Sequence, residues 1–258
     1  MLRGHNEDSV VALPAEGLAI LADGMGGYNA GEVASGMATT LLARELEAAF
    51  AARRPEENAA GSGPSSVRRC IIDKVATTNR AIFQAAQSQP QYAGMGTTLV
   101  AALFRDNRVT VAHIGDSRLY RLRGSEFGTL TRDHSLLQEQ IDSGIISAED
   151  ARHSRNKNLV TRALGVAPEV DTEIHDYAVQ PGDIYLLCSD GLNDMVDDEE
   201  IGLALQMLGA NLDLAATQLI QMANDNGGRD NVSVILVKVL HEFPAAVGWW
   251  EKLMACFR

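Results

Sequence analysis

The sequence predicts an α+β fold in which helical layers pack over antiparallel β-sheets. Three observations lead to this class. Segments with apolar residues at helical spacing occur in pairs, in the first and in the last third of the chain. Strand-like runs follow one another through short turns, which is typical of antiparallel pairing. Neither a fixed-period repeat nor a long linker divides the sequence, so we expect a single domain over residues 1–240 and a short tail over 241–258.

The composition excludes several classes of function. The chain has 22 Lys plus Arg and 34 Asp plus Glu, a net charge of −12, so it lacks the basic surface that a nucleic acid partner needs. Its three cysteines have no metal-type spacing and cannot all pair, which favours a reducing, cytoplasmic compartment. No early apolar stretch resembles a signal peptide or a membrane span, and we expect a soluble protein.

The first third is expected to hold a β-hairpin and two long helices. Residues 9–13 and 18–22 have the pattern of short strands, joined by a turn at 14–17. Apolar residues recur at helical spacing over 31–54 and again over 67–87, which predicts two amphipathic helices. The stretch between them is rich in Gly, Ser, Pro and Glu and is expected to be a loop.

The rest of the chain begins with strands and ends with a second pair of helices. A meander is expected over 97–104, 108–114 and 117–122. A polar stretch with short helical pieces follows over 136–158. The last third is expected to contain strands over 170–178, 184–188 and 232–239, with helices over 197–208 and 212–226.

Carboxylates recur at the ends of the expected strands. The apolar run 18–22 stops at Asp23, and the glycine-rich turn Gly24-Met25-Gly26-Gly27 follows at once. Asp116 and Asp190 come directly after two further strands, and Asp230 precedes the last one. A single Asp-Gly is common at ordinary turns, but four such sites indicate an acidic cluster at one edge of the sheets.

A convergent acidic cluster needs a cation, because like charges destabilise one another unless they are neutralised. Oxygen ligands without His or Cys favour Mg²⁺ or Mn²⁺ over zinc. Two such ions can activate water and stabilise an in-line displacement at phosphorus. Arg3 is the candidate to bind the phosphate oxygens, since a guanidinium matches their geometry. From the residues alone, the competing interpretation is that each Asp merely caps a turn.

An ordered series of motifs resembles the metal-dependent serine/threonine protein phosphatases of the type 2C, or PPM, family, in its bacterial form. The resemblance runs from Arg3 to about Val239. Any one motif is a weak signal, whereas eight in order are a strong one. They are Arg3-Gly4-His5-Asn6-Glu7-Asp8, Asp23-Gly24-Met25-Gly26-Gly27, Gly94-Met95-Gly96-Thr97-Thr98, Gly115-Asp116-Ser117-Arg118, Leu130-Thr131-Arg132-Asp133-His134-Ser135, Thr161-Arg162-Ala163-Leu164-Gly165, Ser189-Asp190-Gly191-Leu192 and Gly228-Arg229-Asp230-Asn231-Val232.

The resemblance implies a four-layer sandwich of two antiparallel sheets, each flanked by a pair of helices. It also implies roles for individual residues. Asp23 would bridge two metal ions, with the Gly24 carbonyl on the second ion and with Asp190 and Asp230 on the first. Asp116 would share a weaker third ion with Asp190. Glu7 and Asp8 would act through metal-bound waters, and Arg3 would hold the phosphate.

The implied activity is hydrolysis of phosphoserine and phosphothreonine in proteins, by direct attack of a hydroxide that bridges two Mn²⁺ or Mg²⁺ ions. A cognate eukaryotic-like serine/threonine kinase is the implied partner. The alternatives are a catalytically silent relative that binds phosphoproteins and, within the enzyme class, a phosphatase dedicated to one regulator. The intact set Asp23, Asp116, Asp190 and Asp230 argues against a silent relative.

Four features qualify these expectations. Arg3 stands very near the start of the sequence, whereas relatives usually carry another strand before this motif. Met25 occupies a place where eukaryotic relatives have a histidine proposed as general acid, so metal-bound water is the expected proton donor. Residues 136–158 correspond to the family's flap, a segment beside the active site. In the tail, Trp249, Trp250, Leu253 and Phe257 form an apolar stripe, for which docking on the domain or fraying is favoured over a membrane anchor.

Overall fold

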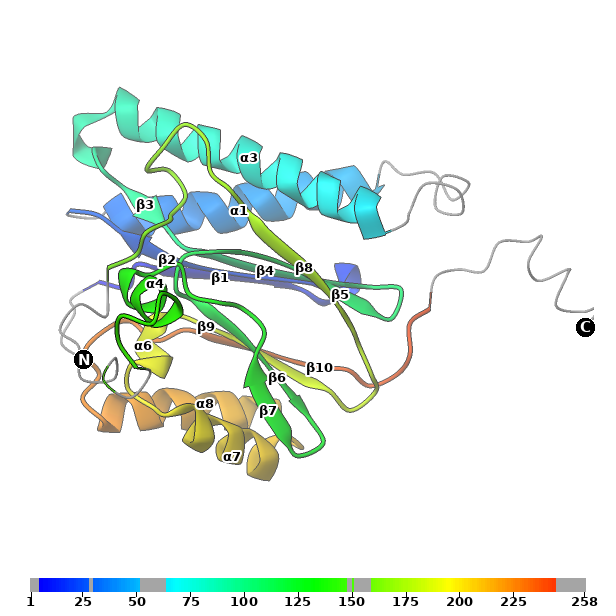
Figure 1. The fold of residues 1–258 in the computed structure, drawn as a ribbon. Coiled ribbons are helices and arrows are strands. Elements are labelled where there is room, and N and C mark those ends of the chain that lie inside the picture. Colours follow the sequence, from blue (N-terminus) through cyan, green and yellow to red (C-terminus); the bar gives the residue numbers. More distant parts are fainter. Residues whose placement is uncertain (1–4, 28–29, 52–63, 148–149, 151–158, 245–258) are drawn as a thin grey trace, which may run out of the picture.

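Two antiparallel β-sheets pack face to face in the computed structural model, and a pair of long helices covers the outer face of each sheet (Figure 1). The structure describes residues 5–27, 30–51, 64–147, 150 and 159–244. The expected four-layer α+β arrangement is confirmed.

The larger sheet has six strands in the order β1-β2-β4-β5-β8, and β3 pairs with the end of β2. The smaller sheet has four strands in the order β10-β9-β6-β7. The bounds of the larger sheet are β1 Asp8–Leu13, β2 Leu18–Met25, β3 Gly96–Thr97, β4 Leu99–Arg105, β5 Arg108–Ile114 and β8 Glu173–Ala178. Those of the smaller sheet are β6 Arg118–Arg123, β7 Glu126–Thr129, β9 Ile184–Cys188 and β10 Val234–Lys238.

The long helices lie outside the sandwich. Helices α1 (Ala30–Ala51) and α3 (Pro64–Ser88) cover the larger sheet, and α7 (Asp198–Leu208) and α8 (Leu212–Asp225) cover the smaller one (Figure 1). The short helices are η1 Pro14–Glu16, η2 Pro90–Tyr92, α4 Leu136–Asp142 and α6 Asp190–Asn193. Buried alanines on α1, among them Ala30, Ala34 and Ala38, let this helix lie close to the strands.

Strand alternation divides the buried side chains into three apolar layers. In β2, Leu18, Ile20 and Ala22 face α1 and α3, whereas Ala19 and Leu21 face the other sheet. In β9, the side chains of Ile184, Leu186 and Cys188 pack toward α7 and α8, and those of Tyr185 and Leu187 pack between the sheets. The central strands are apolar on both faces for this reason, which explains the continuous apolar runs in the sequence.

The structure differs from the expected elements in several places. Strand β2 continues to Met25 instead of ending at residue 22, and β8 begins at Glu173 instead of at residue 170. The strand expected over 97–104 is split into β3 and β4 at Thr98. The Asp23 amide donates to the Thr98 hydroxyl at 2.9 Å instead of to a backbone carbonyl, so the regular ladder is interrupted here. Strand β7 was not predicted, since Glu126-Phe127-Gly128-Thr129 shows little strand pattern. Its Phe127 ring stacks on Tyr120 with the centroids 5.1 Å apart, and this contact holds β7 at the sheet edge.

Candidate metal centre

The expected acidic cluster forms at one end of the sandwich. Asp8 and Asp23 are direct partners in the antiparallel ladder between β1 and β2. The Ser189 hydroxyl, at the end of β9 in the other sheet, donates to Asp8 Oδ2 at 2.8 Å and so joins the two sheets. Asp190 follows Ser189 as the first residue of α6. Asp230 precedes β10, which pairs with β9, so it reaches the same end of the sandwich.

Two threonines fix the position of Asp23. Thr97 Oγ1 donates to the Asp23 carbonyl at 2.8 Å, and the Thr98 amide donates to the same oxygen at 2.9 Å. The Thr98 hydroxyl accepts from the Asp23 amide and also lies 2.7 Å from Ser117 Oγ. Both backbone polar groups of Asp23 are therefore held, and the same network reaches Ser117, the residue after Asp116.

Glycine is required where the backbone segments of the centre meet. The Gly24 amide donates to the Glu7 carbonyl at 3.1 Å, and a Cβ atom on Gly24 would lie only 2.1 Å from the Gly31 carbonyl oxygen. A Cβ atom on Gly191 would lie 1.9 Å from the Asn231 carbonyl oxygen. Neither close approach leaves room for a side chain.

Asn231 connects the beginning of the described chain to the loop before β10. Its Oδ1 accepts from the Glu7 amide at 2.9 Å, and its Nδ2 donates to the His5 carbonyl at 3.0 Å. The residue is 4% exposed, so both bonds are shielded from water. Asn231 therefore sets Glu7 and Asp8 beside Asp230.

The carboxyl groups strongly perturb one another. Burial, followed by the charges of Asp190, Asp8, Asp116 and Asp230, raises the pKa of Asp23 well above its ordinary value. Burial, followed by the charge of Asp116, raises the pKa of Asp190 to about 8. Burial, followed by the charge of Asp133, raises the pKa of Asp116 to about 6. These carboxyl groups therefore lie close enough to one another to interact electrostatically.

Asp194 belongs to this site and was not predicted. Its charge contributes to the raised pKa of both Asp116 and Asp190. Its amide donates to the Asp190 carbonyl at 2.8 Å, so one turn of α6 places the two acids on the same side. The spacing of Asp190 and Asp194, four residues apart in the sequence, is the signal that could have identified it.

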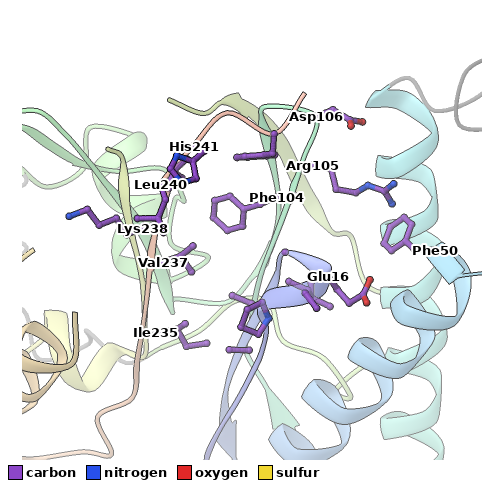
Figure 2. Close-up of a pocket in the computed structure, with 18 of the residues that line it drawn as sticks. Glu16, Phe50, Phe104, Arg105, Asp106, Ile235, Val237, Lys238, Leu240 and His241 are labelled. Atoms are coloured by element: carbon purple, nitrogen blue, oxygen red, sulfur yellow. The ribbon is translucent and has the colours of Figure 1, made fainter. Parts of the chain in front are cut away.

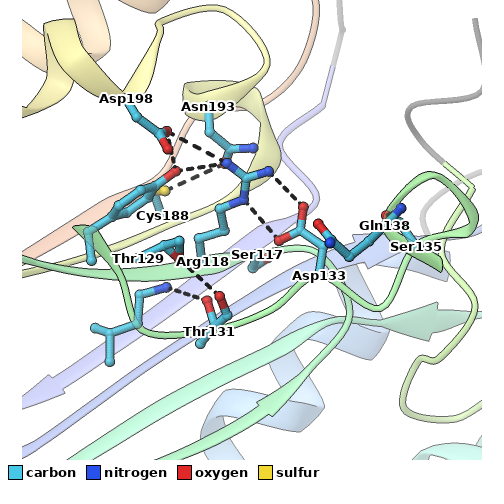
Figure 3. Close-up of polar contacts among 12 residues, drawn as sticks. Ser117, Arg118, Thr129, Thr131, Asp133, Ser135, Gln138, Cys188, Asn193 and Asp198 are labelled. Carbon is cyan, nitrogen blue, oxygen red and sulfur yellow. Dashed lines mark hydrogen bonds and ion pairs between the residues drawn. The ribbon is translucent and has the colours of Figure 1, made fainter. Parts of the chain in front are cut away.

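An ion pair supports the turn that carries Asp116. Arg118 donates to Asp133 through Nε at 2.9 Å and through Nη2 at 2.7 Å, and its Nη1 donates to the Tyr120 hydroxyl at 3.0 Å. In Figure 3 the guanidinium of Arg118 lies between the carboxylates of Asp133 and Asp198. Because the bidentate pair is fixed in orientation, it anchors the strand immediately after Asp116.

The residues present fit a pair of divalent cations. The acidic groups named above offer only oxygen, the donor that Mg²⁺ and Mn²⁺ prefer. Besides burial, the charges of Asp190 and Asp8 contribute to the raised pKa of Asp23, a repulsion that a bound cation would offset. Two buried oxygens, Asp8 Oδ1 and Asp190 Oδ1, have no hydrogen-bond partner among the described residues.

Comparison with known proteins identifies this arrangement. The profile of the family described as protein phosphatase 2C matches residues 4–237. The chain belongs to the protein phosphatase 2C family. It is 38% identical over 240 residues to a serine/threonine phosphatase, stp, of Listeria welshimeri, an alignment that covers 92% of this chain and 91% of that protein. It is 39% identical over 240 residues to the serine/threonine protein phosphatase PstP of Mycobacterium tuberculosis, which covers 93% of this chain and 43% of that protein.

Solved structures of protein phosphatase 2C relatives agree with the fold. The Mycobacterium tuberculosis phosphatase PstP/Ppp superposes with a TM-score of 0.80 at 38% identity, over 93% of this chain and 95% of that one. The catalytic domain of PstP in complex with two manganese ions superposes with a TM-score of 0.78 at 38% identity, over 93% and 94%. The expected family and enzyme class, a serine/threonine phosphatase, are confirmed.

A second group of possible metal ligands in this family member is better explained as a hydrogen-bond network. His113, His134 and Glu173 offer ligand atoms that all lie within 4.8 Å of one another. The Gly115 amide donates to His134 Nδ1 at 3.1 Å, so the proton of the neutral ring is on Nε2, which contacts Glu173 Oε2 at 3.0 Å. No lone pair of His134 is then left for a metal ion.

The two histidines hold the turn that carries Asp116. His113 Nε2 contacts the Ser117 carbonyl at 3.0 Å, and the His134 amide donates to the Gly115 carbonyl at 2.7 Å. Burial is the main cause that lowers the pKa of His113 to about 3, so this ring is neutral. Together they bracket Gly115-Asp116-Ser117 on both sides.

Several expectations for the phosphatase fall partly or wholly outside the described residues. These are Arg3, the second half of the expected flap and the tail from residue 245. The described part of the flap includes α4, capped by Ser135, whose Oγ accepts from the Gln138 amide at 3.2 Å. Met25 ends β2 and is half-buried. Within the described residues, no helix has both the length and the apolar composition needed to cross a bilayer.

Proposed function

We propose that this phosphatase removes phosphate from phosphoserine and phosphothreonine in proteins at a centre of two Mn²⁺ or Mg²⁺ ions. The convergence of Asp23, Asp190, Asp230 and Asp116 is the observation that carries the proposal. Two buried carboxylate oxygens that find no hydrogen-bond partner in the described part of the chain add to it. The crystal structure of the catalytic domain of the relative PstP in complex with two manganese ions supports the same metal count.

Each acidic residue has a proposed role. Asp23 would contact both ions, the Gly24 carbonyl one of them, and Asp190 and Asp230 the other. Asp116 and Asp190 would hold a weaker third ion. When bound, the cations supply an activated water for direct attack at phosphorus and neutralise the phosphate charge. Arg3 would hold the phosphate, and Glu7 and Asp8 would bind water at the edge of the site.

Hydrogen bonds that hold several of these residues in place support the proposed roles. Thr97 and Thr98 hold the Asp23 backbone, so its carboxylate is oriented before any ligand binds. Ser189 orients Asp8. Met25 has a thioether, which carries no proton to donate, so the proton that the leaving hydroxyl group needs would come from water.

The wider setting is also a proposal. Phosphorylated proteins would be the substrates, a serine/threonine kinase would produce them, and the cytoplasm would be the compartment. The division into one phosphatase domain over 1–240, with a flap over about 136–158 and a tail over 241–258, belongs to the same proposal.

A phosphatase assay on a phosphothreonine peptide, with Mn²⁺ and Mg²⁺ titrated separately, tests the proposed function. We expect metal-dependent release of phosphate that is lost in Asp190→Ala, retained in Asp213→Ala on the exposed side of α8, and weakened mainly through KM in Arg3→Ala. Full activity in the presence of a chelator would contradict the metal mechanism. Binding of the phosphopeptide without turnover by the folded wild type would instead establish a silent, regulatory relative.

A further inference from the structure

A further carboxylate, Asp133, lies at the edge of the acidic centre and has no role in the proposed mechanism. Two hydrogen bonds join its neighbour His134 to Gly115. The Gly115 amide donates to His134 Nδ1 at 3.1 Å, and the His134 amide donates to the Gly115 carbonyl at 2.7 Å. Asp133 directly precedes His134, whereas Asp116 directly follows Gly115. The paired loops therefore carry the two acids side by side.

Arg118 occupies both oxygens of the Asp133 carboxylate. Its Nε donates to Oδ1 at 2.9 Å and its Nη2 donates to Oδ2 at 2.7 Å (Figure 3). The side chains are 25% and 13% exposed, so water screens the pair only weakly. The Arg118 Nη1 donates to the Tyr120 hydroxyl at 3.0 Å, and this hydroxyl donates to Asp198 Oδ1 at 2.8 Å. These bonds hold the guanidinium beside Asp133, where the two opposite charges cancel.

The charges of this ion pair act on Asp116. Burial is the main cause of the raised pKa of Asp116, and the charge of Asp133 is the next. The charge of Arg118 acts in the opposite direction. A negative charge that disfavours ionisation of Asp116 attracts a cation to the same place, and a positive charge repels that cation. Arg118 therefore offsets the attraction that Asp133 exerts on a cation bound by Asp116.

We propose that Arg118 is a positioning residue that sets the affinity of the cation site at Asp116, because it holds Asp133 in an ion pair and cancels its charge. This inference rests on the proposed function, in which Asp116 and Asp190 hold a third, weaker ion. The weakness of that site is then a property of the Arg118–Asp133 pair as well as of its own ligands.

The same strand offers a matched control at its other end. Arg123 makes an equivalent bidentate pair, since its Nε and Nη2 donate to the two carboxylate oxygens of Asp183 at 2.8 and 2.7 Å. Its side chain is 25% exposed, like that of Arg118. Strand β6 leads away from Asp116, and Arg123 at its end lies toward the end of β10, where Lys238 lines an apolar pocket (Figure 2). Loss of the Arg123 pair removes similar hydrogen bonds without changing the charge beside Asp116.

Binding of Mn²⁺ to the full-length chain tests the proposal without relying on turnover. Electron paramagnetic resonance counts free Mn²⁺ during a titration and so separates tightly bound ions from the weakest one. In Arg118→Gln the charge of Asp133 is uncompensated, and we expect the weakest ion to bind roughly 10-fold more tightly. In Asp133→Asn the guanidinium keeps its charge without a partner, and we expect that ion to bind roughly 10-fold more weakly. The double variant, Arg118→Gln with Asp133→Asn, should return to within about 3-fold of the wild type.

Three further variants separate charge from shape. Arg118→Lys keeps the positive charge but loses the planar fork, and we expect the affinity of the weakest ion to stay within about 3-fold of the wild type. Arg123→Gln is expected to stay within the same limit, about 3-fold. With Asp116→Asn already present, Arg118→Gln should no longer alter Mn²⁺ binding, which assigns the effect to the Asp116 site.

A purely structural role for Arg118 predicts weaker binding in Arg118→Gln, in Asp133→Asn and in the double variant, and this result would overturn the proposal. Unchanged binding in Arg118→Gln, or an equal change in Arg123→Gln, would also overturn it. Far-UV circular dichroism of each variant checks the fold. If Arg118→Gln does not fold, the double variant leaves no unpaired charge and must bind the weakest ion roughly 10-fold more tightly than Asp133→Asn.

The wild-type titration distinguishes failure of this inference from failure of the proposed function. Two tightly bound ions that are lost in Asp190→Ala, with no third ion, would overturn the inference and leave the proposed function standing. A folded wild type that binds no Mn²⁺ would contradict both.

Discussion

At the scale of single residues, the acidic centre lowers the stability of the metal-free fold in order to bind cations. The Asp190 carboxyl is buried beside Asp116, Asp194 and Asp230, and its pKa is raised from the ordinary 3.8 to about 8. A raised pKa means that this group stabilises the fold fully below pH 3.8, and that the stabilisation is lost as the pH rises toward 8. Bound cations would replace the missing protons at neutral pH, so we expect metal binding to release protons and to strengthen as the pH rises.

The first prediction concerns Asp190→Asn in the presence of a chelator. The amide removes a buried charge, so at pH 8 we expect the free energy of unfolding to increase by on the order of 2 kcal/mol relative to the metal-free wild type. Urea denaturation at pH 5 and pH 8 measures it, and the gain should be smaller at pH 5. The same variant should lose stabilisation by Mn²⁺ and lose activity. A destabilised variant at pH 8 would show that the pKa of Asp190 is not raised in the native state.

The second prediction concerns His113, whose pKa is lowered to about 3 by burial. The unfolded chain takes up a proton on this ring below about pH 6.5, whereas the native state does not, so stability is present above pH 6.5 and falls progressively toward pH 3. In His113→Gln, whose amide can still donate to the Ser117 carbonyl, the fall should be shallower by up to about 1.4 kcal/mol per pH unit. Equal slopes for the two proteins between pH 6 and pH 4 would refute the assignment of a neutral ring.

At the scale of elements, most of the fold could be predicted because each strand and helix has a local pattern. The limits of β5 and β9 agree with the expected 108–114 and 184–188, since both are continuous apolar runs bounded by turns. The break at Thr98 could not be predicted, because it depends on a hydrogen bond to Asp23, 75 residues away. Strand β7 was missed for the same reason, since its ladder partner in β6 and the stacking of Phe127 on Tyr120 define it rather than its own sequence.

The third prediction concerns this break between β3 and β4. Thr98→Val preserves the shape of the side chain but leaves the Asp23 amide and the Ser117 hydroxyl without their common partner. We expect a loss of about 1–3 kcal/mol in the free energy of unfolding and about a 10- to 100-fold loss in Mn²⁺ affinity. Metal titrations followed by thermal denaturation measure both effects. Thr98→Ser keeps the hydroxyl and is the control; a similar loss in Thr98→Ser would attribute the effect to packing.

At the scale of the whole molecule, the residues of the acidic centre that could not be predicted are those whose roles depend on contacts between distant parts of the chain. The carboxylates Asp23, Asp116, Asp190 and Asp230 could be predicted because each follows or precedes a strong strand. The contribution of Asp194 could not, since it depends on how α6 turns toward Asp116. The role of Asn231 was also missed, because its two hydrogen bonds reach residues more than 200 positions earlier in the chain.

The fourth prediction uses the net charge of −12. A negative molecule repels a phosphopeptide unless basic residues flank the phosphate, so kcat/KM should depend on salt in opposite directions for two substrates. For a phosphothreonine peptide with flanking Arg or Lys, kcat/KM should fall as NaCl is raised at constant Mn²⁺. For a peptide of the same length with flanking Glu, it should rise. Parallel responses of the two peptides would show that local charges at the site outweigh the overall field.

The connection through Asn231 also has a consequence for protein synthesis. The Glu7 amide can donate its hydrogen bond to Asn231 only after Asn231, 224 residues further along the chain, has been synthesised. Asp230 directly precedes Asn231 in the sequence. A ribosome must therefore release nearly the whole sequence before the last carboxylate can join the others. Chains that are still being translated, or that end early, cannot complete the centre. The order of segments along the chain thus delays assembly of the acidic centre until Asp230 and Asn231 have been synthesised.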